Sequence, residues 1–578
     1  PPNRGTEAAA RALSVALETN RRLEDLRLGR RFPHGAALRK RVRRRAAGDA
    51  APDEDMLAVR SVYRVPARRP STKQAATSRA ATSTAEEHDL KQPTPSISDA
   101  DLATCAKVLD ALRAQPGAFF ERTATFSPVR AAANRLIHAI QRESRARKTN
   151  RRRSATPRPD RQRQDRDRNA RRDRELVEAT GIRRRRSEGR RLGIQAEVAS
   201  DAAPAQPLAH PKTCHICRGR YVELHFFYDA LCPGCADLNY GKRHQSADLS
   251  GRVAVVTGGR VKIGHQIALK LLRAGATVHL TTRFPCSAAA RFDAAADADD
   301  WRDRVHIVGI DLRSLPAVEG LAVRWAEQLP RLDFLINNAA QTIRRPPAFY
   351  APLMEAETRG VDALPARAGR LVATSLSQPH AAQLSQRRLL PEDADAALFF
   401  PAGAYQEDRQ PLDLRPRNSW SFELGDVSSL ELLEVHAINA MAPFILLRQL
   451  QDLMTESRRR GGARGGHVVN VSAMEGSFSR AFKGQNHPHT NMAKAALNMM
   501  TRTCAGPLAE RGVFVHSVDT GWITDEQPEP TRRRMRGDDG FEPPLDEIDG
   551  AARVLDPVFQ DLRPGGSFWK DYRPGRRS

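Results

Sequence analysis

The chain has 578 residues and a mass of 64.0 kDa, which is too long for one hydrophobic core and indicates two or three domains. Residues 1–200 hold 46 Lys and Arg against 24 Asp and Glu, whereas the remainder holds 47 against 44. We therefore expect a strongly basic N-terminal arm and a nearly neutral body that can form a core. No window approaches ~18 consecutive apolar residues, which excludes a membrane-spanning helix of that kind.

The N-terminal arm, residues 1–97, is rich in Ala, Arg, Ser and Thr and has little periodicity, so we expect it to be largely disordered. Its basic block at 39–45 is alternatively a nuclear address or a nucleic-acid patch, although aromatic support is absent there. Because the chain begins with Pro1, a targeting segment can be neither seen nor denied. We expect a cytoplasmic protein, with organellar or nuclear targeting left open.

Residues 98–148 carry apolar residues at helical spacing on both sides of Pro116-Gly117, which predicts a helical hairpin. Residues 149–204 are dense in Arg and contain no aromatic residue. Sequence-specific RNA modules stack bases on aromatic side chains, so this segment offers charge without a reading surface. We expect a charged linker or helix, with nonspecific polyanion contact as the alternative.

Four of the seven cysteines form two CxxC pairs separated by fourteen residues. Each pair makes a tight turn that points two thiolates at one ion, and this spacing is typical of a structural zinc site. A redox dithiol is the alternative, but such a site normally follows a strand and needs no second copy. We therefore predict a zinc module at 205–247, with His215 and His225 beside the site rather than ligands. The predicted ligands are Cys214, Cys217, Cys232 and Cys235.

From residue 248 the pattern alternates between short apolar strands and helical segments. The first strand, at 253–256, is followed by a glycine-rich turn and a helix, and five further apolar strands follow along the chain. This order predicts an α/β fold with a doubly wound, Rossmann-like parallel sheet. The glycine-rich turn places backbone N–H groups and a helix N-terminus where a pyrophosphate can sit.

The order of motifs over 250–578 resembles the short-chain dehydrogenase/reductase family, here with an N-terminal four-cysteine module and some unusual residues. Residues 257–264 are similar to the TGxxxGIG turn of that family, 337–340 to its NNAG, and 519–524 to its PGxxxT. Asp311-Leu312 is similar to its adenine-contacting pair. The resemblance implies that the dinucleotide contacts Gly258, Ile263, Gly264, Asp311, Leu312, Asn338, Ala339, Lys494 and Thr524.

The catalytic residues depart from the family pattern. Thr490 stands where the family has Tyr, and Ala473 stands where it has the catalytic Ser. A Thr hydroxyl titrates far too high to replace Tyr near neutral pH, whereas His is naturally poised there. His489 or His487 is therefore the candidate proton donor. The alternative is that both are ordinary residues of a loop without a catalytic role. The candidate catalytic set is Lys494, Asn439, His489, Thr490 and Ser472, the last by rotating into the site.

The choice of nicotinamide is set at the end of the second strand, where an acid favours NAD and an Arg favours NADP. The chain has Arg283 there and no acid, while Arg260 and Lys262 add positive charge in the first turn. Arg pairs with phosphate through a planar fork, so the local chemistry favours NADP over NAD. The alternative is that Arg283 is a solvated loop cation.

An insertion at about 341–418 is longer than the ~2–6 residues usual after a strand, and its composition favours a lid or partial disorder. Two functions stay open. The first is an NADP-dependent oxidoreductase acting on a small carbonyl or alcohol substrate, which the family resemblance allows to form a homo-oligomer. The second is a catalytically impaired dinucleotide-binding scaffold whose zinc module and basic arm recruit a protein or nucleic-acid partner.

Overall fold

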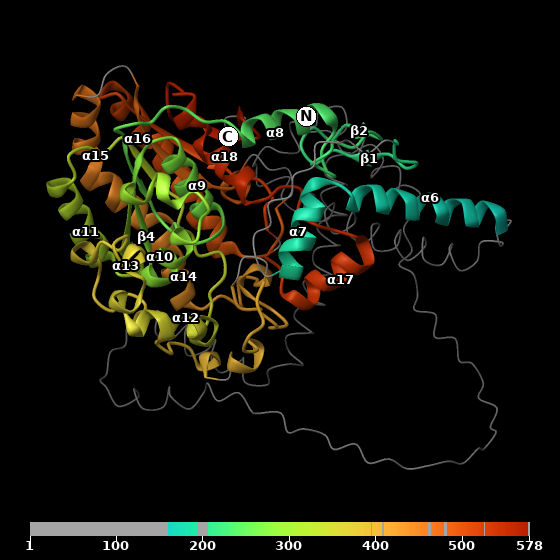
Figure 1. Ribbon diagram of the computed structural model, residues 1–578, viewed down its shortest axis with the longest axis horizontal. Coiled ribbons are helices and arrows are strands. Elements are labelled where there is room, and N and C mark those ends of the chain that lie inside the picture. The colour runs from blue at the N-terminus through green and yellow to red at the C-terminus, as the bar shows by residue number, and fades with distance from the viewer. Residues whose placement is uncertain are drawn as a thin grey trace, which may run out of the picture. The chain divides into compact units, whose positions relative to one another are not determined.

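The computed structural model describes residues 160–192, 206–394, 396–406, 410–460, 464–478, 483–524 and 526–575 (Figure 1). These residues belong to one unit of the chain, which begins at Pro157. The predicted arm at 1–97 and the predicted hairpin at 98–148 lie outside the described residues, as does part of the Arg-rich segment.

An eight-stranded sheet forms the centre of the described chain, in the order β10-β9-β8-β7-β6-β3-β4-β5. All neighbours are parallel except β9 and β10. The order reverses between β3 and β6, and the crevice at such a reversal is where α/β sheets bind ligands. The predicted doubly wound sheet is confirmed. The strands are β3 (Val253–Val256), β4 (Thr277–Thr282), β5 (Val305–Gly309), β6 (Phe334–Asn337), β7 (Gly466–Ser472), β8 (Val513–Asp519), β9 (Phe568–Lys570) and β10 (Arg573–Pro574).

Helices cover both faces of this sheet. Along β3, Ala254 and Val256 enter one buried cluster and Val253 and Val255 enter another. Burial on both faces explains why the strands are almost continuously apolar rather than alternating. The first cluster contains residues of α9 (Lys262–Arg273), α10 (Pro285–Asp293) and α18 (Glu547–Phe559); the second contains residues of α11 (Leu315–Gln328), α15 (Ala442–Arg460) and α16 (Pro488–Glu510).

A long helix runs from α14 (Ser429–His436) through a π-helical turn, η11 (Ala437–Met441), into α15. Among the described residues, the segment Ser429–Arg460 is long and apolar enough to cross a membrane, by length and composition only. Polar residues interrupt it, so it does not meet the criterion of consecutive apolar residues used above. Its apolar window is 56% buried, and α15 packs against α11 as a core helix does.

The insertion has regular structure, which differs from the partial disorder that its composition favours. It contains α12 (Pro347–Arg359), α13 (Ala366–Gly369) and several 3-10 turns. Its segment 371–378 runs beside β5: the Ile307 N–H donates to the Leu371 carbonyl at 2.7 Å, and the Ala373 N–H donates back to the Ile307 carbonyl at 2.8 Å. The insertion thus covers the free edge of β5, which would otherwise expose unpaired backbone groups.

The segment before the sheet comprises α6 (Asp160–Glu178), α7 (Gly181–Leu192), β1 (Lys212–Thr213), β2 (Arg220–Tyr221) and α8 (Pro233–Arg243). The helix α7 lies beside α17 (Glu529–Asp539), where Arg183 donates to the Gly540 carbonyl at 3.1 Å (Figure 1). Arg185 pairs with Asp546 and Glu547. This part of the Arg-rich segment is therefore a docked helix in which Arg183 and Arg185 have carbonyl and carboxylate partners.

Candidate functional site

The glycine-rich turn between β3 and α9 lies against the end of β6. Gly258 has φ +71°, and a Cβ there would lie 2.9 Å from Ala339 Cα. A Cβ on Gly264 would lie 2.2 Å from the Gly258 carbonyl oxygen. The Thr257 hydroxyl accepts from the N–H groups of Asn338 and Ala339, each at 3.0 Å. The turn therefore holds the N-terminus of α9 in the crevice where the strand order reverses.

Lys262 occupies the middle glycine position of this turn with φ 53°, a left-handed conformation that costs a side-chain-bearing residue about 1–2 kcal/mol. Its ammonium lies 3.5 Å from Glu526 Oε1, and the Thr524 hydroxyl donates to the same oxygen at 2.6 Å. Burial would raise the pKa of Glu526, but the Lys262 ammonium and the Thr524 hydroxyl bring it below its usual value. Lys262 therefore links the glycine-rich turn to the loop after β8.

Two guanidinium groups meet at the end of β4. Those of Arg260 and Arg283 lie 5.3 and 5.5 Å from the centre of the Phe284 ring. Arg283 also donates to the Tyr350 hydroxyl of α12 at 2.7 Å. Arg283 is half-buried and held by the insertion, so it is not a solvated loop cation. Tyr350 was not predicted, because nothing in the sequence ties it to a residue 67 positions earlier.

Asp311 and Leu312, the predicted adenine-contacting pair, follow β5, and both are buried. Both carboxylate oxygens of Asp311 accept hydrogen bonds from Arg313, and the Asp311 N–H donates to Gln378 of the insertion at 3.0 Å. Burial would raise the pKa of Asp311, but the hydrogen bonds from Arg313 bring it below its usual value. The carboxylate is thus fixed in its charged form, and its contact with adenine stays a prediction.

Lys494 lies on α16 and is buried, with its ammonium donating to the Val471 carbonyl at 2.7 Å. Burial lowers the pKa of Lys494 to about 8, although the carboxylates of Glu475 and Asp519 act in the opposite direction. One turn earlier on the same helix, the Thr490 hydroxyl is buried and has no hydrogen-bond partner within the described ranges.

The other predicted catalytic residues have hydrogen-bond partners of their own. The Ser472 hydroxyl donates to Asn498 Oδ1 at 2.6 Å, so this side chain is engaged with α16. Asn439 lies in the π-helical turn, a frequent feature of functional sites, and its Oδ1 accepts from the Gln341 N–H at 2.7 Å. The catalytic roles of these two side chains stay predictions.

The two histidines occupy different surroundings. His489 is 1% exposed in the first turn of α16, and its Nε2 lies 3.4 Å from Glu431 Oε1 on α14. Neither ring nitrogen of His489 has a hydrogen bond within the part of the chain that the structure describes. His487 lies just before α16, stacks on Trp420 with ring centres 4.1 Å apart, and has its Nδ1 3.1 Å from Asn491. Glu431 carries no motif, so sequence reasoning missed it.

The four predicted metal ligands come together: every pair of Sγ atoms among Cys214, Cys217, Cys232 and Cys235 lies within 4.8 Å. Four thiolates at about 2.3 Å from one tetrahedral ion would be about 3.8 Å apart, which this spacing accommodates. Cys232 caps the N-terminus of α8, so the second pair is built into a helix start. The imidazole Nδ1 of His225 accepts from the N–H groups of Phe227 and Tyr228, which fits a supporting role rather than ligation.

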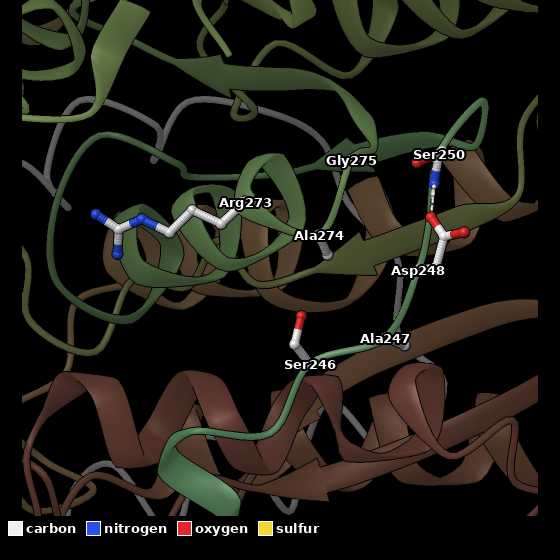
Figure 2. A pocket seen from close by; sticks show the side chains of 7 residues that line it. All are labelled: Ser246, Ala247, Asp248, Ser250, Arg273, Ala274 and Gly275. Atoms are coloured by element: carbon white, nitrogen blue, oxygen red, sulfur yellow. Dashed lines mark hydrogen bonds between the residues drawn. The ribbon is translucent and has the colours of Figure 1, made fainter. Parts of the chain in front are cut away.

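A hollow of about 450 Å³ lies elsewhere, beside the connection between α9 and β4 and the segment before β3 (Figure 2). Figure 2 shows the Ser250 N–H donating to the Asp248 carboxylate, at 3.0 Å, along its rim. These residues lie at the amino ends of the strands, whereas ligands of this sheet type bind at the carboxyl ends. The hollow is therefore separate from the candidate site.

Two protein-family models match separate segments of this chain, and a longer match is with a viral protein. A family model described as short chain dehydrogenase matches residues 252–357, and one described as Enoyl-(Acyl carrier protein) reductase matches residues 418–539. An uncharacterized protein of Acanthamoeba polyphaga mimivirus is 32% identical over 381 residues, covering 63% of this chain and 74% of the viral protein. The segments 252–357 and 418–539 therefore resemble short-chain dehydrogenases and reductases.

Two further matches are with named proteins. Dehydrogenase/reductase SDR family member 13 of Bos taurus is 42% identical over 124 residues, which cover 21% of this chain and 29% of the bovine protein. Among solved structures, the NADP complex of Pseudomonas aeruginosa RhlG is 20% identical with a TM-score of 0.35, covering 56% of this chain and 94% of that chain. The chain thus spans less than a third of the bovine relative.

Proposed function

We propose that this chain is a short-chain dehydrogenase, an NADP-dependent oxidoreductase that interconverts a carbonyl and an alcohol. The observation that carries the proposal is the pair of guanidinium groups of Arg260 and Arg283, which both lie against the Phe284 ring at the end of β4. No acidic residue occurs in the segment 281–287 to bond the ribose 2′-OH of NAD. The Glu357 carboxylate of α12 lies beside this segment and accepts from two of its backbone N–H groups, at 2.9 and 3.2 Å. The nicotinamide would supply or accept the hydride.

The rest of the dinucleotide would lie along the carboxyl edge of the sheet. The first turn of α9, which contains Ile263, offers backbone N–H groups to the pyrophosphate. The Lys262 ammonium would exchange Glu526 for a pyrophosphate oxygen, as a point charge beside that helix end. The remaining proposed contacts are those of Gly258, Gly264, Asp311, Leu312, Asn338, Ala339, Lys494 and Thr524.

His489 is the proposed acid/base group. Glu431 lies 3.4 Å from its Nε2 and would stabilise the imidazolium, as a carboxylate does for the histidine of a catalytic triad. In the reducing direction the imidazolium would give its proton to the substrate oxygen as the carbonyl carbon receives the hydride, and solvent would return the proton. Lys494 and Asn439 would orient the cofactor and substrate, while Thr490 and Ser472 are secondary candidates.

A second candidate function is a dinucleotide-binding scaffold without turnover. It is favoured by the Lys494 ammonium, which donates to the Val471 carbonyl, and by Thr490 in place of the usual Tyr. Fluorescence titration of the purified chain with NADPH and NADH separates the candidates. Saturable NADPH binding with oxidation over a panel of carbonyl compounds supports the enzyme, whereas binding without turnover, unchanged in Lys494→Ala, supports the scaffold. No saturable binding of either cofactor removes both.

Arg283→Glu is expected to weaken NADPH binding at least tenfold and NADH binding less than twofold. The substitution places a carboxylate where the 2′-phosphate would pair with the guanidinium, while NADH lacks that phosphate. Tyr350→Phe is the matched control, because it removes only the hydroxyl that accepts from Arg283. An equal loss for both cofactors would contradict the assignment of Arg283.

The four-cysteine module is proposed to hold one structural zinc ion. Metal analysis of the purified chain is expected to give one zinc per chain, and Cys235→Ser is expected to lose it together with several degrees of thermal stability. Cys286→Ser is the control, because that buried thiol lies apart from the cluster. Clearly less than one zinc per chain in the parent protein would refute the site.

A further inference from the structure

The zinc module shares one apolar core with the loops that flank the proposed dinucleotide site. Cys214 and Tyr228 of the module lie in the same buried cluster as Ile523, which belongs to the 519–524 segment, and Ile263 packs against this cluster from the first turn of α9. A Cβ added at Gly550 of α18 would lie 3.0 Å from Ile263 and 3.3 Å from Ile523. The four-cysteine module therefore packs against both the first turn of α9 and the segment 519–524.

A chain of buried hydrogen bonds joins a metal ligand to one of these loops. Asn239, one helical turn after Cys235, donates through Nδ2 to the Cys235 carbonyl at 2.7 Å. The Asn239 Oδ1 accepts from Arg553 Nη2 at 2.9 Å, and Arg553 Nη1 donates to the Thr520 carbonyl at 2.9 Å. Asn239 is 1% exposed and Arg553 is 2% exposed, so water cannot easily replace these partners.

The backbone around Thr520, where this series of hydrogen bonds ends, has little conformational freedom. Gly521 has φ +80°, and a Cβ there would lie 2.2 Å from Arg553 Nη1. The Gly521 N–H donates to Asp519 Oδ1 at 2.7 Å, while Asp571 accepts from Arg553 at 3.0 Å. The guanidinium therefore fixes where the Thr520 carbonyl and the following residues lie.

We propose that Asn239 and Arg553 are positioning residues through which the metal-loaded four-cysteine module sets the backbone of the segment 519–524, beside the proposed cofactor site, and so raises NADP(H) affinity. The proposal rests on the proposed function. A bound ion holds the two cysteine pairs together, and with them the first turn of α8 and the Cys235 carbonyl. Without the ion, the Cys235 carbonyl would no longer be held in place as the acceptor for Asn239. Asn239 would then no longer be aligned to accept from Arg553. Linkage requires the effect to be mutual, so NADPH must raise metal affinity by the same factor.

The test measures NADPH dissociation constants and zinc content together. Asn239→Leu keeps the size of the side chain but removes both hydrogen bonds, and it is expected to weaken NADPH binding about tenfold with one zinc per chain retained. Lys242→Ala is the matched control: it breaks the 2.6 Å ion pair between α8 and Asp556 of α18 without touching the hydrogen-bond chain. It is expected to change NADPH binding less than twofold at a similar thermal stability.

A second measurement needs no variant. Saturating NADPH is expected to raise the zinc affinity of the parent protein about tenfold in a competition with a coloured chelator, and to have no such effect in Asn239→Leu. If the parent protein binds NADPH but zinc affinity is unchanged, or if both variants bind NADPH equally, the coupling is overturned while the proposed function stands. If the parent protein does not bind NADPH, both fall.

Discussion

Replacing Lys494 with Met is expected to make the protein more stable while removing turnover. The charged Lys494 is buried, and its pKa is lowered to about 8 from an ordinary value of 10.5. Keeping that charge at pH 7 costs about 3 kcal/mol. Loss of the bond to the Val471 carbonyl returns about 1–2 kcal/mol of this, so we expect a net gain of about 1–2 kcal/mol in the free energy of unfolding.

The pH dependence follows from the direction of the shift. Between about pH 8 and pH 10.5 the unfolded chain binds the Lys494 proton and the folded chain does not, so the stability of the parent protein rises with pH there. The advantage of Lys494→Met is therefore largest below about pH 8 and shrinks as the pH approaches 10.5. Urea unfolding at pH 7 and pH 9.5 measures both quantities.

Lys270→Met provides the control. The Lys270 ammonium is half-buried, donates to the Arg243 carbonyl at 2.6 Å and also has a pKa lowered to about 8 by burial. Lys270 lies in the last turn of α9, at the opposite end from the glycine-rich turn, so its replacement is expected to leave turnover unchanged. A fall in turnover of at least 10³-fold for Lys494→Met alone supports the proposed role in orienting the cofactor. A destabilised Lys494→Met protein would contradict the cost assigned to the buried charge.

The strands from β3 to β8 could be predicted because most of their residues are buried, on both faces of the sheet. The predicted segment 253–256 agrees with β3, and the predicted segment 278–280 lies inside β4. Short, mainly apolar segments of this kind are typical of strands that helices cover on both faces. The two-residue β10 is too short to leave such a pattern. The spacing of the cysteines was also sufficient to predict that they cluster, because the four Sγ atoms lie within 4.8 Å of one another.

The parts that escaped prediction depend on contacts between distant segments. Arg283 is placed by Tyr350, and His489 by Glu431, and in both cases the partner comes from a segment without a motif. The insertion looked disordered because its apolar residues have no period of their own. Leu371 and Val372 instead follow the edge of β5, an arrangement that only the folded sheet provides.

Asp546→Asn is expected to cost about 3 kcal/mol of stability. This carboxylate accepts from Arg243 at 2.6 and 2.8 Å and also pairs with Arg185. Removing one partner of a buried ion pair leaves the other charge uncompensated, which typically costs about 3–5 kcal/mol. Asn is itself a good helix cap, so the hydrogen bonds that Asp546 makes at the start of α18 are retained and the change isolates the charge.

We expect a loss at the lower end of the range of about 3–5 kcal/mol because a second carboxylate, that of Asp549, lies beside Arg243. Burial and the Asp546 charge raise the pKa of Asp549, which lies 3.1 Å from Arg243. Without the charge at 546, Asp549 ionises more easily and partly replaces the lost partner. Burial would raise the pKa of Asp546 itself, but Arg243 and Arg185 hold it well below its usual value. Its stabilising effect is therefore complete above about pH 4 and is lost only as the pH falls through the folded pKa.

Thermal and urea unfolding at pH 7 check the prediction, with Asp297→Asn as the control. Asp297 accepts from Arg273 at 2.7 Å in a partly exposed pair, and such pairs contribute about 0–1 kcal/mol. Arg185 of α7 and Arg243 of α8 both pair with the carboxylate of Asp546, the N-cap residue of α18. The substitution should therefore also loosen α7 and increase its cleavage by protease. A loss below about 1 kcal/mol with α7 still protected would mean that apolar packing, rather than this ion cluster, holds the Arg-rich helix on the fold.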